Sequence, residues 1–285
     1  MFGFLNVYKP NGKTSHDVVA ILRRITKIKQ IGHTGTLDPF AEGVLPICIG
    51  KATRLIEYLD DDKAYIGTVQ LGSSTATYDI EGERVNYSDK NVSIEEVNEV
   101  LKEFRGDIEQ LPPIYSAIKV NGKKLYEYAR NGEGVKIEPR RVNIKELAVK
   151  NYDSENRQLE IFVACSKGTY IRSLANDIGE KLGIYGHLIK LIRVKAGRFE
   201  LDNSISLENL QTLEQVEQNL IKPVEYLNYP KYELNEKELE LVSHGMEINS
   251  RQELENGIVV LTNNEKLIAI GECINNKIKS HKVFI

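Results

Sequence analysis

The chain has 285 residues, of which 41% are hydrophobic and 28% are charged, and its formal net charge is −3. This composition is typical of a globular protein and excludes a disordered chain, and the length allows one large domain and one small one. No apolar run approaches the roughly 18 residues of a membrane span, and Lys9 and Asp17 interrupt the start of the chain, so neither a membrane segment nor a secretory signal is expected. The three cysteines are far apart and show no CxxC spacing. This suits a reducing cytoplasm and argues against a zinc site or a disulfide framework.

The charge is unevenly distributed along the chain. Residues 1–55 hold eight Lys/Arg against three Asp/Glu, residues 118–150 hold nine against four, and residues 163–199 hold seven against two. Each of these three segments is therefore +5, although the whole chain is mildly acidic. Such segregation is compatible with one face that binds nucleic-acid phosphates. Interspersed, solvated surface charge explains it about as well.

The first predicted element is a helix. Thr14 and Asp17 form a T-x-x-D capping box, and apolar residues then recur at helical spacing up to a basic turn at residues 27–29. The segment 31–46 is rich in Gly, Thr and Pro and predicts a long, structured loop rather than a helix or strand. Residues 64–71 have the composition of a strand.

A second capping box, Ser93 with Glu96, predicts another amphipathic helix. In residues 114–130, Asn121-Gly122 separates two strand-like runs and predicts a β-hairpin. The remaining elements expected before residue 200 are three strands and one helix: strands at 142–150, 158–165 and 188–194, and a helix over about 170–183 that stops at Gly183.

Strands therefore outnumber helices without regular βαβ alternation, which predicts an α+β fold with a largely antiparallel mixed sheet. Near residues 225–232 the pattern changes, and short strands with turn signals follow in the runs GIVVLTN, NEKLIAIGEC and HKVFI. We expect a catalytic or binding domain over residues 1–228 and a small β-barrel module over residues 229–285.

Residues 32–55, GHTGTLDPFAEGVLPICIGKATRL, are the segment richest in chemical signals. Its glycines do not form a P-loop, because Gly50-Lys51 is followed by alanine and residue 45 is leucine. No G-x-G-x-x-G dinucleotide fingerprint is present, and His33 lacks the H-x-E pattern of a zinc deaminase. These three classes of nucleotide site are excluded.

What remains in this segment is one carboxylate, Asp38, in a loop that contains Gly35, Pro39 and Gly43. Glycines permit close backbone approach, and Pro39 biases the preceding residue away from helix, so the loop suits a fixed nucleophile or general base. An Asx-turn at Asp38 is the competing interpretation, and on local sequence alone it is favoured.

The motif GHTGTLDPxAxGVLPxCxGxAT resembles the catalytic motif of the TruB family of tRNA pseudouridine synthases. Four further segments resemble family blocks in the same order, and together they cover about residues 2–200: LNVYKPNGKTS, KAYIGTVQLGSSTATYDIEGE, LPPIYSAIKVNGKKLYEYAR and CSKGTYIRSLANDIGEKLG. The resemblance implies the pseudouridine synthase fold with a C-terminal PUA-like module. It also implies isomerisation of uridine-55 in the T arm of tRNA, with flipping of the target base.

The resemblance assigns roles to individual residues. Asp38 matches the essential aspartate, and Arg172 matches the arginine that pairs with it, which is expected to keep the aspartate pKa low. Tyr65 matches the tyrosine that stacks on the flipped base, and Tyr170 and Leu191 match positions that line the uridine pocket. Without the resemblance, each of these would pass for a core aromatic, a core leucine or a surface arginine.

Two more residues are expected at the site. His33 matches the residue that fills the space left by the flipped nucleotide, although a lone histidine is more often structural. Lys9, beside Pro10, is expected near the floor of the RNA-binding site, where it supports the structure and pairs with a carboxylate. The basic stretches 119–141 and 190–198 are expected to contact RNA phosphates.

The isomerisation needs no redox step and no external energy, so no cofactor is expected, and no metal, obligate protein partner or membrane either. The protein is expected to be a cytoplasmic monomer. Three alternatives stay open: an RNA-folding chaperone, a guide-RNA-dependent pseudouridine synthase, and a glycoside hydrolase. The last normally needs two working carboxylates, and only Asp38 is presented in this way.

Overall fold

The computed structural model describes residues 1–285 and shows an elongated molecule built on two separate sheets. The larger sheet has the strand order β14-β1-β3-β12-β4-β11-β10-β7, with β13 added to β12 and β2 added to β3. Its strands are β1 Gly3–Lys9, β2 Ile31–His33, β3 Glu42–Ile49, β4 Lys63–Leu71, β7 Gly106–Gln110, β10 Arg140–Asp153, β11 Gln158–Cys165, β12 Gly186–Ala196, β13 Phe199–Glu200 and β14 Ile205–Ser206.

Most of these pairings are antiparallel, as the sequence predicted. The two exceptions in this sheet are β1 with β14 and β3 with β12, both parallel. Strand β12 lies between β3 and β4, so Arg193 faces Gly43 across one edge and Tyr65 across the other. The change from antiparallel to parallel pairing therefore occurs in the middle of the sheet, beside the loop that joins β2 to β3.

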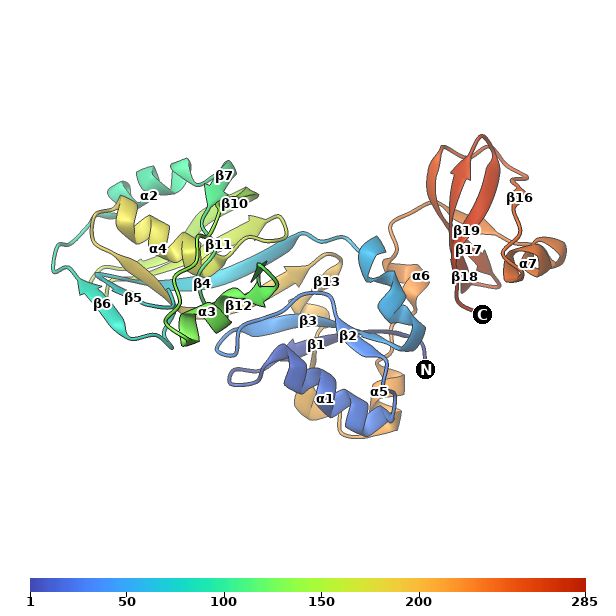
Figure 1. Ribbon diagram of the computed structural model, residues 1–285, viewed down its shortest axis with the longest axis horizontal. Helices are drawn as coiled ribbons and strands as arrows, with labels where there is room; N and C mark the ends of the chain where they lie inside the picture. Colours follow the sequence, from blue (N-terminus) through green and yellow to red (C-terminus); the bar gives the residue numbers. More distant parts are fainter.

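Helices α1, α2 and α4 pack on the same face of the twisted large sheet, because their buried residues belong to one core; Figure 1 shows α1 at one end of the sheet and α2 and α4 at the other. The first four α-helices of the chain are α1 Ser15–Thr26, α2 Ile94–Glu103, the short α3 Leu125–Arg130 and α4 Ile171–Lys181. Both predicted capping boxes are present, at Thr14 for α1 and at Ser93 for α2. The apolar faces of α1, α2 and α4 join the inward residues of the strands in one core of 35 buried residues.

The strands β1 and β3 contribute side chains to two hydrophobic cores, because successive residues of a strand point to opposite faces of the sheet. Leu5 and Ile47 belong to the helix-covered core. Phe4 and Cys48 face the other way, into a second core of 12 residues that also includes Phe284 near the end of the chain. The C-terminal module is thus packed onto the back of the same two strands that lead into the Asp38 loop.

The C-terminal module is a five-stranded curled sheet with the order β15-β17-β18-β19-β16, flanked by one helix. Its elements are β15 Lys231–Glu233, α7 Glu236–Ser243, β16 Ile248–Asn249, β17 Gly257–Asn263, β18 Lys266–Ile274 and β19 Lys277–Val283. This agrees with the predicted small PUA-like β module. The run GIVVLTN coincides with β17, and the final run HKVFI only overlaps the end of β19.

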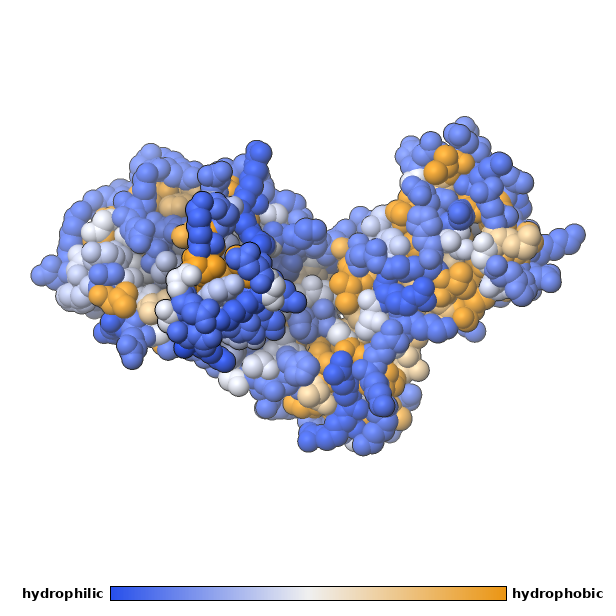
Figure 2. All heavy atoms as spheres, viewed as in Figure 1, coloured by the Kyte–Doolittle hydropathy of each residue, from blue (hydrophilic) through white to orange (hydrophobic).

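Polar contacts reinforce the junction between the module and the larger part. Lys51 Nζ, in the 3₁₀ helix η1 Gly50–Tyr58, donates to the carbonyls of Phe284 and Ile285 at 2.9 and 3.0 Å. Arg54 donates to the carbonyl of Val283 at 2.9 Å. Figure 2 shows that a notch still separates the two parts on the visible face. A few short elements connect them: η2 Leu201–Asn203, η3 Leu207–Asn209, α5 Leu213–Gln218 and α6 Pro223–Tyr226.

Two predictions about local structure were wrong. Residues 31–46 are not one loop, because β2 ends at His33 and β3 begins at Glu42. Pro46 lies within β3 although it has no backbone N–H to donate, and its carbonyl accepts a hydrogen bond from the backbone N–H of Thr34 at 3.1 Å. The glycines and prolines that suggested a loop instead permit a strand that is almost wholly buried.

The other wrong prediction concerns the second half of the hairpin. The turn at Asn121-Gly122 is correct, with φ of 51° and 81°, and it joins the two-residue strands β8 Lys119–Val120 and β9 Lys123–Lys124. The chain then forms α3 rather than a strand. Glu127 accepts the backbone N–H of Lys124 at 3.0 Å, a contact that starts a helix and that strand-like alternation of tyrosines concealed.

A second two-stranded sheet pairs β5 Ser73–Thr75 with β6 Arg84–Tyr87. No helix in the structure combines the length and the apolar character required to cross a bilayer.

Candidate active site

The loop between β2 and β3 presents Asp38 and is fixed from several sides. Ser15 Oγ, at the start of α1, accepts the backbone N–H of Leu37 at 2.8 Å. The carbonyl of Pro39 accepts the backbone N–H of Gly12 at 2.9 Å. The Asp38 carbonyl closes a turn with the N–H of Ala41 at 3.1 Å. These contacts hold the loop backbone without using the Asp38 carboxylate.

The Asp38 side chain does not form the Asx-turn that local sequence favoured, because its oxygens point to Arg172 on α4. Arg172 Nε lies 2.9 Å from Asp38 Oδ2, and Nη2 donates to Oδ1 at 3.3 Å. The guanidinium is 5% exposed, whereas 34% of the Asp38 side chain remains accessible. The arginine thus holds the carboxylate on its buried side and leaves the other side of the carboxylate accessible.

A second carboxylate shares this arginine. Arg172 Nη1 donates to Asp79 Oδ2 at 3.2 Å, and Asp79 is nearly fully buried. The remaining donors of Arg172 meet the carbonyls of Thr77 and Tyr115 at 3.3 and 3.0 Å. Because both carboxylates and both carbonyls bind one rigid guanidinium, its position is fully determined.

The expectation of a low pKa for Asp38 was wrong. Burial raises the pKa of Asp38 above its ordinary value, the nearby charge of Asp79 adds to this, and the guanidinium of Arg172 opposes it. The carboxylate is accessible only to a confined cavity and is therefore poorly hydrated, which disfavours its charged form. A carboxylate with an elevated pKa is a stronger base than an exposed one, and this suits proton abstraction.

Asp38 lies in a cavity of about 620 Å³, which is the size of sites that enclose a small molecule or one nucleoside. Its wall brings together five of the predicted residues. These are Asp38, Tyr65, Tyr170, Arg172 and Leu191. They come from the β2–β3 loop, β4, α4 and β12, so only the tertiary fold assembles them.

The aromatic and apolar lining residues are firmly held. Tyr65 is 7% exposed and Leu191 is 5% exposed, on the adjacent strands β4 and β12. Burial raises the pKa of both Tyr65 and Tyr170, so both phenols stay neutral at physiological pH. The backbone of Tyr170 exchanges two hydrogen bonds with the amide of Gln110, at 2.7 and 3.0 Å.

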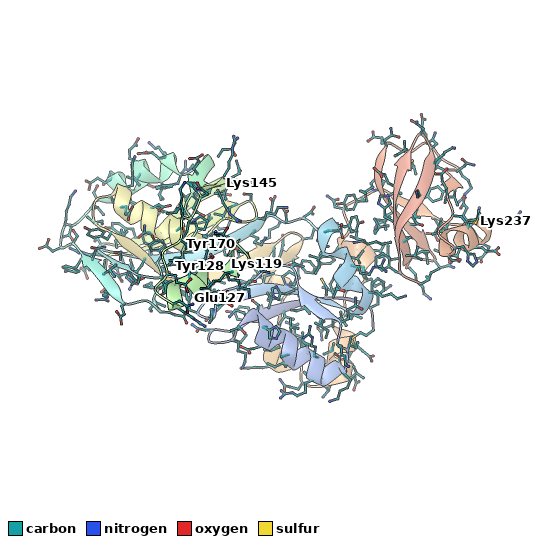
Figure 3. All side chains as sticks on the ribbon, in the orientation of Figure 1. Lys119, Glu127, Tyr128, Lys145, Tyr170 and Lys237 are labelled. Atoms are coloured by element: carbon teal, nitrogen blue, oxygen red, sulfur yellow. The ribbon has the colours of Figure 1, made fainter.

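A polar, aromatic segment lies over one side of the cavity. Tyr126 and Arg130 of α3 line it, and Figure 3 shows the neighbouring Lys119 and Tyr128 close to Tyr170 in this view. Lys123 is engaged with Glu133 at 2.6 Å, so part of the positive charge in the stretch 119–141 is already neutralised within the protein.

His33 lies outside the cavity wall. It ends β2, two residues before Gly35, which is the first lining residue of the loop. Burial, with a contribution from the charge of Arg193, lowers the pKa of His33, so its ring is neutral at physiological pH. Its Nδ1 is buried and makes no hydrogen bond.

Lys9 is also absent from the cavity wall and has no exposed surface. Its ammonium donates to the carbonyls of Pro10, Lys13 and Pro39 at 2.9, 2.5 and 3.1 Å. It therefore binds the Asp38 loop through the carbonyl of Pro39. The predicted pairing of Lys9 with a carboxylate is wrong, and a buried ammonium has no surface to offer to RNA. Burial lowers the pKa of Lys9 to about 8.

The low pKa of Lys9 predicts a pH-dependent contribution to stability. Between pH 8 and the unfolded value near 10.5, the folded protein releases this proton and the unfolded chain keeps it. The unfolded state then binds more protons, so the free energy of unfolding rises with pH in this window. We expect wild type to gain stability relative to Lys9→Met from pH 8 to 10, measured by urea unfolding. A stability difference that stays constant over this range would contradict the prediction.

Sequence reasoning missed two residues of the site. Asp79 lies in a family-like block but carries no local signal of its own, since its role depends on Arg172, which is 93 positions away. Arg193 is fully buried on β12 and donates to the carbonyls of Gly35, Thr36 and Val44 at 3.1, 3.4 and 2.7 Å. It makes no ion pair with a carboxylate, and it ties both ends of the Asp38 loop to the centre of the sheet.

The structure brings together no group of three or more His, Cys, Asp or Glu side chains that could hold a metal ion. What the site offers is the carboxylate of Asp38, oriented by Arg172, together with a neutral phenol and an apolar wall in a cavity of nucleoside size. These groups can bind a flat heterocycle and transfer a proton to or from it or its sugar.

Comparison with known proteins identifies the family to which this site belongs. Residues 23–171 match the TruB family pseudouridylate synthase (N-terminal domain), and residues 172–227 match the tRNA pseudouridylate synthase B C-terminal domain. The chain belongs to the TruB family of pseudouridylate synthases. These proteins are isomerases, and the Asp38 motif lies within the first matched region.

Relatives of similar length support the TruB assignment along the whole chain. Proteins named tRNA pseudouridine synthase B from Caldanaerobacter subterraneus subsp. tengcongensis and Staphylococcus haemolyticus are each 44% identical to this chain. In both cases the alignment covers 99% of this chain and 99% of the relative.

Solved structures share the fold of this TruB family member. The chain resembles the protein in a Cbf5-Nop10-Gar1 complex with a TM-score of 0.75 and 26% identity, over 100% of this chain and 85% of the other. A protein in an H/ACA ribonucleoprotein bound to a substrate RNA containing 2′-deoxyuridine gives the same TM-score and coverage at 24% identity. The pseudouridine synthase fold and its added C-terminal sheet are therefore shared with these proteins.

Proposed function

We propose that this protein converts uridine-55 in the T arm of tRNA to pseudouridine and that Asp38 is its essential catalytic residue. The observation that carries the proposal is the placement of Asp38. Its carboxylate is held by Arg172 within a cavity of nucleoside size, beside Tyr65 and Leu191. The relatives that match this chain over nearly its full length are named tRNA pseudouridine synthase B.

The reaction breaks the N1–C1′ bond of the uridine, turns the uracil and forms a C5–C1′ bond; C5 loses its proton and N1 gains one, so the composition of the nucleotide is unchanged. Asp38 contributes in its ionised form, by attack on the base, by attack on the sugar or by removal of a ribose proton. Arg172 orients the carboxylate and stabilises its charge, so the reacting oxygen faces the cavity. The reaction is a rearrangement within one nucleotide, and the proposal invokes no cofactor.

The target base must leave the RNA stack to reach Asp38. We propose that Tyr65 stacks on the flipped uracil, that Leu191 and Tyr170 enclose it, and that His33 occupies the space the base leaves. A neutral imidazole at His33 suits stacking against nucleobases, because a charged ring there would need a counter-ion. The lowered pKa of His33 supports this role.

The rest of the proposed RNA interface lies outside the cavity. The basic stretches 119–141 and 190–198 contact phosphates through their exposed cations, which excludes the buried Arg193. Residues 1–228 form the catalytic domain and residues 229–285 a small RNA-binding module. The protein acts as a cytoplasmic monomer without an obligate protein partner. Phosphate contacts of this kind make affinity fall with salt concentration.

The decisive experiment uses pure protein and an unmodified tRNA transcript, with pseudouridine mapped by carbodiimide treatment and primer extension. We expect one new stop at position 55. Binding without any modification would contradict the proposal and favour an RNA-folding chaperone. Modification only after addition of a guide RNA and partner proteins would instead favour a guide-RNA-dependent pseudouridine synthase.

A further inference from the structure

Lys63 is a cation in the active-site wall to which the proposed function gives no role. It begins β4 and lies two residues before Tyr65, so the two side chains project from the same face of the strand and both line the cavity. Its ammonium makes one hydrogen bond, to the carbonyl of Asp61 at 3.0 Å. Two of its three N–H donors therefore remain available to a ligand.

No carboxylate forms an ion pair with Lys63, although three acidic residues immediately precede it in the chain and the charge of Asp61 acts on it. Asp61 is paired with Lys167 at 2.6 Å, and Asp62 is paired with Lys145. The charge of Arg172, in contrast, is neutralised, because Asp38 and Asp79 both form ion pairs with it. Lys63 thus keeps its positive charge available on a half-buried surface.

The backbone opposite Lys63 has no side chain. A Cβ atom added to Gly35 would lie 3.3 Å from Lys63 Cε and 3.9 Å from its Nζ. Arg193 Nη1 would lie 3.7 Å from the same point. The corner formed by Gly35, Lys63 and Arg193 is therefore lined by two cations and bare backbone.

The buried Arg193 strengthens the positive field in this corner. Its guanidinium has only carbonyl partners, so no negative charge cancels it. Burial lowers the pKa of Lys63, and the charge of Arg193 lowers it further, which is the effect expected of two cations that face each other in a poorly hydrated place. An anion bound here would relieve that repulsion.

We propose that Lys63 binds a phosphodiester oxygen of the RNA backbone adjacent to the flipped uridine. The inference rests on the proposed function, because that function brings an RNA strand into this cavity. Because Lys63 and Tyr65 lie two residues apart on β4 and line the same cavity, a nucleotide stacked on Tyr65 lies beside Lys63. A compact ammonium with free donors and no internal partner is suited to a phosphate oxygen.

The test compares Lys63→Met with Lys102→Met, in which the lost lysine is exposed, forms an ion pair with Glu99 on α2 and lies outside the cavity wall. Binding of tRNA and single-turnover pseudouridine formation are measured for both. We expect Lys63→Met to weaken tRNA binding by about 10-fold, the lower range for a charge-assisted hydrogen bond, while the rate at saturating RNA is nearly unchanged. The slope of log affinity against log salt should become shallower by about 0.7 to 1.

Substrate RNAs with a single neutral methylphosphonate at each linkage around the target then locate the contact. One such RNA should bind wild type about 10-fold more weakly and Lys63→Met little more weakly than the unmodified RNA does. Equal affinity of the two lysine variants, or equal sensitivity to every methylphosphonate, would overturn the inference. Should Lys63→Met fail to fold, the methylphosphonate series on wild type still decides, since an absence of any sensitive flanking phosphate overturns it. Failure of wild type to form pseudouridine would instead refute the proposed function.

Discussion

Asp38→Asn is expected to lower the rate of pseudouridine formation by at least about 10⁴-fold, the upper range for the loss of a single acid–base group. Asparagine keeps the shape of the side chain and loses the negative charge, so neither attack nor proton abstraction remains possible. Single-turnover conversion of a tRNA transcript measures the effect. Asp38→Ala should behave in the same way, and substantial residual activity in both variants would contradict a catalytic role for Asp38.

The stability of Asp38→Asn provides the control for misfolding. Burial raises the pKa of Asp38 in the folded protein, so the unfolded chain releases this proton at lower pH than the folded chain does. In the window between the two pKa values the folded state binds more protons, and stability falls as pH rises. At pH 7 the neutral asparagine avoids this penalty. We therefore expect a Tm no lower than that of wild type.

The raised pKa also predicts the acid side of the activity profile. If the ionised carboxylate of Asp38 is the working form, the single-turnover rate should decline at a pH above the ordinary carboxyl value of 3.8. The measurement is the rate against pH over the range in which circular dichroism shows a folded protein. A rate that stays constant down to pH 4 would contradict this assignment of the working form.

Arg193→Met is expected to destabilise the protein by about 3 kcal/mol or more. The change removes the donor from the buried carbonyl of Val44, and an unsatisfied buried acceptor costs roughly 1–3 kcal/mol. It also removes the donors from the part-buried carbonyls of Gly35 and Thr36. The loop that presents Asp38 would lose its attachment to β12. Urea unfolding with linear extrapolation gives the change in the free energy of unfolding.

Two further variants sharpen this prediction. Arg24→Met removes an exposed arginine of α1 for which the structure shows no ion pair, and it should change stability by less than about 0.5 kcal/mol. Arg193→Lys keeps the charge but cannot reach both ends of the loop as the guanidinium does, so it should lie between wild type and Arg193→Met. Equal stability of Arg193→Met and Arg24→Met would show that the arginine does not hold the loop.

The elements whose signals are local were predictable. The capping boxes at Thr14 and Ser93 determine where α1 and α2 begin, because the two side chains that satisfy each other lie three residues apart. The turn at Asn121-Gly122 and the strand Gly257–Asn263 are equally local. The prediction of one loop over residues 31–46 was wrong because glycine and proline usually mark a loop. Here they also occur in the buried strand β3, whose partners β1 and β12 lie elsewhere in the chain.

The sequence by itself determined the family, the α+β class and the identity of five residues that meet in the cavity, since an ordered set of motifs preserves their types and spacing. The tertiary structure decided how they interact. It alone showed that Asp79 shares Arg172 with Asp38, that burial outweighs the arginine in the pKa of Asp38, and that Lys9 and Arg193 bind carbonyls of the loop that contains Asp38. Desolvation and hydrogen-bond partners depend on residues from β1, β4, β12 and α4 being packed together, and no spacing along the chain encodes that distance.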